Sequence, residues 1–261
     1  MAADLRSLLD AGSLVVAPFV VDALQALVAR QAGARAVYVT GFGTAATHGH
    51  PDLGIIGLDE IVANARRVAA AVDVPVVADA DTGYGDVRRT VEAHVAAGVA
   101  AVHLEDQVWP KRCGFFDGKQ VVPAADHERV VRDAVDAARG TGLLVIARTD
   151  ALEPHGWDEV VDRVRRYRDA GADLCFVDGL RGRADAEACA ERLPDVPLVY
   201  NGLLPAAEVE ALGFRLMLAI ASMLRTFDDL RRTMAALVAD GALDVDPGLL
   251  HELASAVGYD G

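Results

Sequence analysis

Two aspartates, Asp79 and Asp81, end the apolar stretch VVADADTGYG at residues 76–85. Residues i and i+2 of a β-strand point to the same side, so the spacing brings the two carboxylates together. Neighbouring carboxylates repel each other unless a proton or a cation lies between them. Mg²⁺ suits such a pair because it takes one or two carboxylates and keeps several waters. Two aspartates that cap a turn or a helix are the alternative at this point.

A second group of reactive side chains lies in EDQVWPKRCGFFDGKQVVP, residues 105–123. Glu105 opens this segment, at the end of an apolar run, and could hold a third metal position or a metal-bound water. Connections between a strand and a helix usually have about 2–6 residues, and long ones are often active-site lids. Lys111 and Arg112 precede Cys113 and would favour its thiolate form. A lone loop cysteine is also compatible with a purely structural role.

The remaining polar side chains of interest also stand where apolar runs end: Thr40, Asp106, Arg148, Asp150, Asp178 and Asn201. The beginnings of the runs carry no comparable set. Parallel strands in a barrel end at one common face, which is where such proteins build their active sites. The distribution therefore indicates catalysis.

Eight short β-rich runs must position these residues: 13–19, 36–40, 74–81, 99–106, 143–150, 172–179, 196–202 and 215–221. Their continuous apolar character predicts strands buried on both faces, and the helical stretches between them supply the crossovers that parallel strands require. We therefore expect one (β/α)8 TIM barrel over residues 1–261, with the barrel at about 12–235 and a C-terminal helical segment at about 236–261. An open doubly wound sheet is the rival, but its glycine fingerprint is absent after the first run.

Composition excludes several partners. A net charge of −14 and a pI of about 4.8 disfavour nucleic acid, which is bound mainly through clustered lysine and arginine. No apolar run approaches the roughly 18 residues of a membrane helix, so no membrane partner is expected. Three cysteines without paired spacing predict no disulfide framework. The first residues lack the features of a secretory signal, which predicts a cytoplasmic location.

Four motifs in this order, YVTGFGTAATHGHPDLG, DADTGYG, HLEDQVWPKRCG and ARTDA, resemble the isocitrate lyase and phosphoenolpyruvate mutase superfamily. The resemblance covers about residues 12–235, and the motifs fall on the ends of the second to fifth expected strands. KRCG is most similar to the carbon–carbon lyase branch, especially methylisocitrate lyase. The resemblance implies a small 2-oxo or 2-hydroxy carboxylate substrate, an enolate-type intermediate and bound Mg²⁺, with Mn²⁺ as the other candidate.

The resemblance also implies roles for individual residues. Asp79 and Asp81 would hold the metal ion, directly or through water, supported by Asp52 and Glu105. Cys113 would protonate the departing carbanion, Lys111 would assist catalysis, and Arg148 would neutralise developing negative charge. Substrate contacts would come from Thr40, Gly41, Phe42, Arg112, Gly114, Asn201 and Arg225, the first three through backbone N–H groups. A homo-oligomer is implied, a tetramer or a dimer, and the short C-terminal tail predicts a shortened or absent helix exchange between subunits.

Two departures from the lyase pattern concern the substrate. The cysteine motif continues with Gly114, Phe115 and Phe116, where the lyases usually have histidine after CG. The seventh run ends in YNGLLPAAE, so only Asn201 stands where isocitrate-type lyases have asparagine, threonine and glutamate. A tricarboxylate is therefore disfavoured, and a smaller or more apolar substrate such as an alkyl-substituted malate is expected.

Three other functions stay open at this stage. Phosphoenolpyruvate mutase and phosphonopyruvate hydrolase chemistry is one, although those branches usually have asparagine and serine in place of the KRCG cysteine segment. Oxaloacetate decarboxylation or hydrolysis needs the same enolate stabilisation without a demanding acid. A non-catalytic binding barrel is the last, and the clustered charged residues argue against it because such groups are costly to bring together without use.

Overall fold

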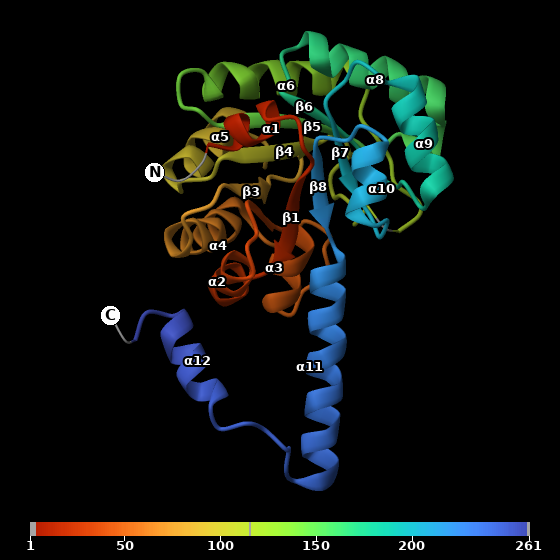
Figure 1. Cartoon of the computed structure of the whole chain (residues 1–261). Helices are drawn as coiled ribbons and strands as arrows, with labels where there is room; N and C mark the ends of the chain where they lie inside the picture. Colours follow the sequence, from red (N-terminus) through yellow and green to blue (C-terminus); the bar gives the residue numbers. More distant parts are fainter. Residues whose placement is uncertain (1–3, 115, 260–261) are drawn as a thin grey trace.

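The computed structural model describes residues 4–114 and 116–259, and eight parallel strands form a closed barrel in chain order, with β8 paired to β1 (Figure 1). The strands are β1 Val15–Val20, β2 Val37–Val39, β3 Val76–Asp79, β4 Ala101–Glu105, β5 Leu144–Thr149, β6 Leu174–Val177, β7 Leu198–Asn201 and β8 Leu216–Ala219. Each predicted run overlaps one strand. The expected (β/α)8 barrel is confirmed.

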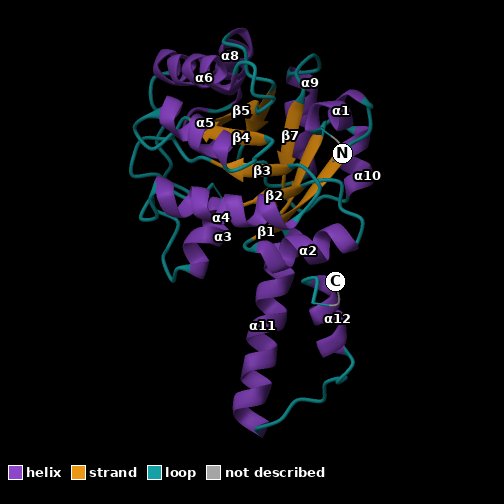
Figure 2. Ribbon diagram, turned by 90° about the vertical axis from the view of Figure 1, so that its left-hand side faces the viewer, coloured by secondary structure: helices purple, strands orange, loops and turns teal. Residues whose placement is uncertain are grey.

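Helices surround the barrel on the outside (Figure 2). They are α2 Ala23–Gln31, α4 Leu58–Ala71, α5 Val87–Ala96, α6 Ala124–Ala138, α8 Trp157–Asp169, α9 Arg183–Arg192 and α10 Ala206–Ala211. Further short helices are α1 Leu5–Asp10, α3 Gly41–Thr47 and α7 Leu152–His155. The carboxylates of Asp22 and Asp86 accept hydrogen bonds from the first turns of α2 and α5, which explains where these helices begin.

The hydrophobic core has an inner and an outer part. Inside the barrel, residues from alternate strand positions pack together, including Phe19, Tyr38 and Phe176. Leu5 and Leu9 of α1 join this inner core. The outer face of the strands packs against the helices in separate clusters, for example Val160 and Val164 of α8. Because both faces of the strands are covered, the sequence reads as continuous apolar runs.

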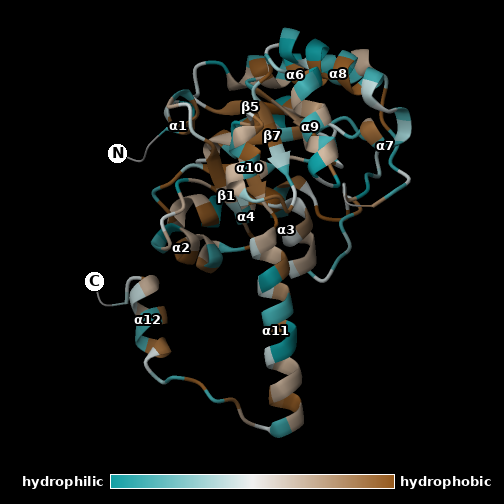
Figure 3. Ribbon diagram, turned by 45° about the vertical axis from the view of Figure 1, so that its right-hand side comes forward, coloured by the Kyte–Doolittle hydropathy of each residue, from teal (hydrophilic) through white to brown (hydrophobic). Residues whose placement is uncertain are grey.

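The C-terminal part departs from the regular barrel pattern. Helix α11, Ala221–Asp240, extends away from the barrel and buries none of its residues, and α12, Leu249–Ala256, returns toward α2 (Figures 1 and 2). The predicted boundary near residue 235 falls inside α11, which continues until Gly241 adopts a φ of 68°. Figure 3 shows hydrophobic and hydrophilic segments alternating along this helix. Its exposed apolar residues include Phe227, Leu230 and Met234. None of the helices in the described ranges combines the length and apolar character of a bilayer-spanning segment.

Candidate active site

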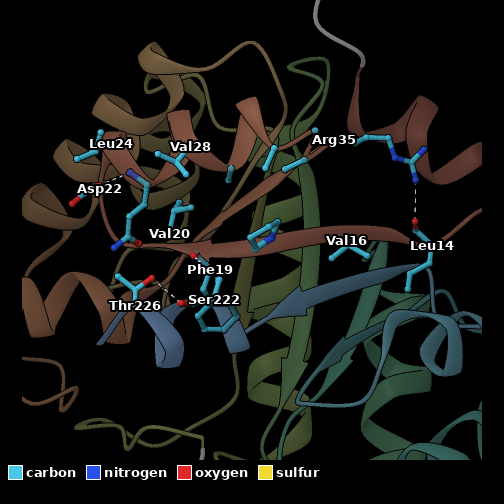
Figure 4. A pocket seen from close by; sticks show the side chains of 16 residues that line it. Leu14, Val16, Phe19, Val20, Asp22, Leu24, Val28, Arg35, Ser222 and Thr226 are labelled. Atoms are coloured by element: carbon cyan, nitrogen blue, oxygen red, sulfur yellow. Dashed lines mark hydrogen bonds between the residues drawn. The ribbon is translucent and has the colours of Figure 1, made fainter. Parts of the chain in front are cut away.

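A cavity of about 320 Å³ lies at the carboxyl end of the barrel. One part of its lining is polar: Tyr38, Thr40, Asp52, Asp79, Cys113, Gly114, Arg148, Asp178 and Asn201. The other part is apolar: Phe19, Phe42, Phe116, Leu203, Ile220, Met223 and Leu224. A larger open groove of about 800 Å³ runs along β1 and α2, but of the strand-end polar residues it contains none (Figure 4). The smaller cavity is therefore the candidate active site.

Asp79 ends β3 and is held by several donors. One carboxylate oxygen accepts hydrogen bonds from the Gly41 N–H at 3.1 Å and the Tyr38 hydroxyl at 3.3 Å, and the other accepts from the Asp81 N–H at 3.0 Å. Burial opposes ionisation, but the positive charges of Lys111 and Arg148 lower the pKa of Asp79, so it is a carboxylate at neutral pH. The donors fix the orientation of this charge.

Asp81 lies beyond the strand, in a turn with a φ of 46°. The strand-alternation argument for Asp79 and Asp81 is therefore wrong, because β3 ends at Asp79. The Asp81 carboxylate accepts a hydrogen bond from the Tyr84 hydroxyl at 2.5 Å and lies 2.7 Å from the Lys111 ammonium. Lys111 also lies 2.5 Å from Asp52. The cation that bridges two carboxylates here is thus Lys111, between Asp52 and Asp81.

Arg148, at the end of β5, is surrounded by acidic side chains. It donates two hydrogen bonds of 2.9 Å to Asp150 and lies 3.2 Å from Glu105 and 3.4 Å from Asp178. Burial opposes its charge, but these carboxylates raise its pKa well above the usual value, so the guanidinium is permanently charged. Burial also raises the pKa of Glu105. The arrangement presents a fixed positive charge at the cavity.

The donor set fits a hard divalent cation. One carboxylate oxygen of Glu105 is buried without a hydrogen-bond or ion-pair partner, and a cation or its waters would satisfy this atom. The other Glu105 oxygen lies 3.2 Å from Arg148, and the buried Asp81 oxygen that lacks a hydrogen bond lies 2.7 Å from Lys111. Over residues 4–114 and 116–259, no three His, Cys, Asp or Glu side chains form a ready ligand set. A cation would then be held by one or two carboxylates and water, which is the coordination that Mg²⁺ accepts.

Two further polar groups face the cavity. Asn201, at the end of β7, has a buried side-chain oxygen without a hydrogen-bond partner, so it can accept one from a substrate hydroxyl. Cys113 lines the cavity from the connection between β4 and α6 and is half-buried.

A family model described as phosphoenolpyruvate phosphomutase matches residues 5–238. The chain belongs to the isocitrate lyase and phosphoenolpyruvate mutase superfamily. It is 41% identical over 225 residues to 2,3-dimethylmalate lyase of Eubacterium barkeri, covering 82% of this chain and 78% of that protein. It is 38% identical over 235 residues to 2-methylisocitrate lyase of Bacillus subtilis, covering 86% and 77%. A solved structure of oxaloacetate acetylhydrolase with 3,3-difluorooxalacetate gives a TM-score of 0.94 at 36% identity, covering 99% and 93%.

Most residues to which the superfamily resemblance assigns roles lie at or beside the cavity, but three do not reach it. The Gly41 N–H is taken by Asp79. Arg112 is exposed, and its backbone is bonded to the Gln107 side chain at 2.8 and 2.9 Å. Arg225 lies on exposed α11 and pairs with Asp229. Phe115 lies outside the described residues. All these roles stay predictions.

The structure adds two residues that the sequence did not single out, Tyr38 and Lys119, and it brings Asp178, named above from its strand end, to the cavity. Tyr38 donates to Asp79 and contacts His103 at 2.7 Å, inside the barrel. Asp178 lines the cavity at the end of β6. Lys119 lies close to it, with 3.2 Å between the ammonium and the carboxylate. Lys119 could have been found from the DGK segment of the long connection, whereas Tyr38 reads as an ordinary strand residue.

Proposed function

We propose that this protein is a Mg²⁺-dependent carbon–carbon lyase that cleaves a small 2-hydroxy carboxylate, such as an alkyl-substituted malate, into an oxo acid and a second carboxylate. The observation that carries the proposal is a cavity lining that combines charged and apolar side chains with Cys113. The 2,3-dimethylmalate lyase relative supports the same reaction class.

The charged side chains that line the cavity suit the reaction chemistry. The 2-hydroxyl first gives its proton to water or to a carboxylate of the site. Breaking the bond between C2 and C3 then turns C2 into a carbonyl, and the bonding electron pair moves to C3 next to a carboxylate. Arg148 offers a buried positive charge for the resulting enolate-type anion. Cys113 then gives its proton to C3. When bound by Asp79 and Asp81, with Asp52 and Glu105 in support, Mg²⁺ supplies further positive charge that polarises substrate oxygens.

The apolar lining residues support a substrate with an alkyl side group. Leu203 stands in the segment where the isocitrate-type lyases have polar residues, and Leu224 and Phe116 also line the cavity. Among the described lining residues, Arg148 is the one cation, and it already contacts three carboxylates. A third substrate carboxylate would therefore find no counter-charge, whereas methyl groups would be buried favourably, by about 0.8 kcal/mol per carbon.

The proposal predicts which substrate turns over. With Mg²⁺, we expect release of an oxo acid, detected as its hydrazone, from 2,3-dialkylmalates at a kcat/KM about tenfold or more above that for malate, since two buried methyl groups supply about 1.6 kcal/mol. Chelation by EDTA should abolish the reaction, and Mg²⁺ or Mn²⁺ added back should restore it. Oxalate and acetate from oxaloacetate, or inorganic phosphate from phosphonopyruvate, with no oxo acid from any malate, would replace the lyase by the alternative activities.

We also propose that the protein is a homo-oligomer, a dimer or a tetramer, in which α11 of one subunit covers the groove of another. The groove along β1 and α2 is lined by apolar side chains such as Val16, Leu24 and Val28 (Figure 4). The exposed side of α11 offers Phe227 and Leu230, among others. The length of α11, 20 residues, and its exposed apolar side support such an exchange.

The assembly predicts a change of mass on mutation. Phe227→Asp should convert the oligomer into monomers in size-exclusion chromatography with light scattering, because a charge would be buried in the apolar groove. Arg232→Asp adds the same carboxylate on the opposite side of α11, at 100° per residue, and should leave the mass unchanged. A wild-type protein that is monomeric at micromolar concentration would contradict the proposal.

A further inference from the structure

The chain contains two lysines, Lys111 and Lys119, although it carries many arginines. Both lysines lie in the connection between β4 and α6, and both are buried, at 3% and 4% exposure. Elsewhere the positive charges of the surface are arginines. The two lysines thus occupy enclosed positions in the same connection as Cys113, where a compact ammonium fits. Lys111 belongs to the carboxylate cluster described above, whereas Lys119 has no part in the proposed chemistry.

Lys119 makes three contacts with its ammonium group. It donates to the Gly114 carbonyl at 2.9 Å, and lies 3.2 Å from Asp178 and 3.1 Å from Asp150. An ammonium has three N–H donors, so these three acceptors use its full capacity. Burial opposes the charge of Lys119, but the two carboxylates raise its pKa, so it is protonated at neutral pH. The contacts join the residue after Cys113 to the ends of β5 and β6.

Gly114 lies unusually close to the barrel. A Cβ atom at this position would lie 1.9 Å from an Asp178 carboxylate oxygen and 2.6 Å from a terminal nitrogen of Arg148. Any side chain would force these groups apart, so glycine is required by the close approach of the backbone. On the other side of Cys113, the backbone of Arg112 is held by the Gln107 side chain. The backbone is therefore held in place on both sides of Cys113, at Arg112 and at Gly114.

We propose that Lys119 is a positioning residue: it binds the Gly114 carbonyl and so holds Cys113 in place over the cavity, against Asp178 and Asp150. The effect on catalysis rests on the proposed function, in which Cys113 delivers a proton to the substrate. The effect on the placement of Cys113 does not, and can be measured without substrate. Lys119 acts on Cys113 through the Gly114 backbone and touches no reacting atom.

The catalytic test compares Lys119→Met with Gln120→Met, an exposed neighbour with the same replacement. We expect kcat to fall about 100-fold in Lys119→Met with little change of KM, because a proton donor displaced by about 1 Å loses this much rate. Gln120→Met should behave as wild type. A Lys119→Met enzyme with wild-type kcat would overturn the proposal, and so would a loss confined to KM.

A rescue experiment separates hydrogen bonding from charge. Propylammonium replaces the part of the side chain that Lys119→Ala removes, and it should restore kcat in a saturable way. Tetramethylammonium carries the same charge without N–H donors and should not. Equal rescue by both cations would overturn the proposal, because Lys119 would then only balance the charges of Asp150 and Asp178. Saturable rescue also shows that the variant is folded.

The substrate-free test measures alkylation of Cys113 by iodoacetamide, followed by peptide mass spectrometry. Cys175 and Cys189 are fully buried and serve as internal references. We expect Cys113 to react several-fold faster in Lys119→Met than in wild type or Gln120→Met, because its segment is no longer held against the barrel. An unchanged rate would overturn the proposal even if the lyase assay failed on every substrate, and a changed rate would support it in that case.

Discussion

Cys113→Ser is expected to lower kcat by about 10²–10⁴-fold, the range for loss of a positioned general acid. The serine hydroxyl fits the same space at the cavity wall but is a far weaker acid than a thiol. KM should change little, because the polar lining residues Arg148, Asp79 and Asn201 are left intact. The residual activity would report proton delivery by water.

The proton transfer can be followed directly. In D₂O, with the oxo acid present, wild-type protein should exchange the C–H next to the carboxylate of the second product, and Cys113→Ser should not. Cys189→Ala, a small change at a buried site on α9, is the control and should keep both activities. Unimpaired turnover in Cys113→Ser would assign the proton to another group and remove the main support for the lyase.

Asp79→Asn is expected to weaken divalent-metal binding by about 100-fold or more, and activity should fall with it. Asparagine removes the negative charge that the site supplies. One of its two terminal atoms also becomes a donor, so the N–H groups of Gly41 and Asp81 can no longer both find acceptors. The damage is therefore local, to charge and to orientation.

Metal binding can be measured apart from activity by titrating the protein with Mn²⁺ and following the free-ion signal in electron paramagnetic resonance. Asp73→Asn, at an exposed ion pair with Arg30, is the matched control and should bind as wild type does. If Asp79→Asn kept the wild-type Mn²⁺ affinity, the metal would have to be placed elsewhere.

The barrel could be predicted from the sequence because its strands are buried on both faces, which leaves continuous apolar runs such as residues 143–150. The direction of α11 could not. Its apolar side, with Leu230 and Met234, has the pattern of a helix that packs on its own barrel, yet α11 extends away from it. A single chain's periodicity tells which face of a helix is apolar, but not which molecule covers that face.

The candidate site was predicted where chemistry and strand ends coincide, as for Asp79, Arg148 and Asn201. The prediction was less good for residues whose position depends on the path of a connection. Lys119 meets Asp178, 59 residues further along the chain, only because the loop folds back over the barrel. Asp81 lies in a turn and has a positive φ, so the alternation of side chains along a strand does not predict where it points. Such placements depend on tertiary contacts, which local patterns do not contain.

Because both lysines are buried, their amines should react slowly with amine-reactive reagents. Dyes, biotin esters and cross-linkers attack unprotonated amines in contact with water, and neither Lys111 nor Lys119 offers one in the described structure. Arginine covers the surface positions that such reagents use in most proteins. The rate at which either lysine is acylated would therefore measure how often the segment around Cys113 moves away from the barrel.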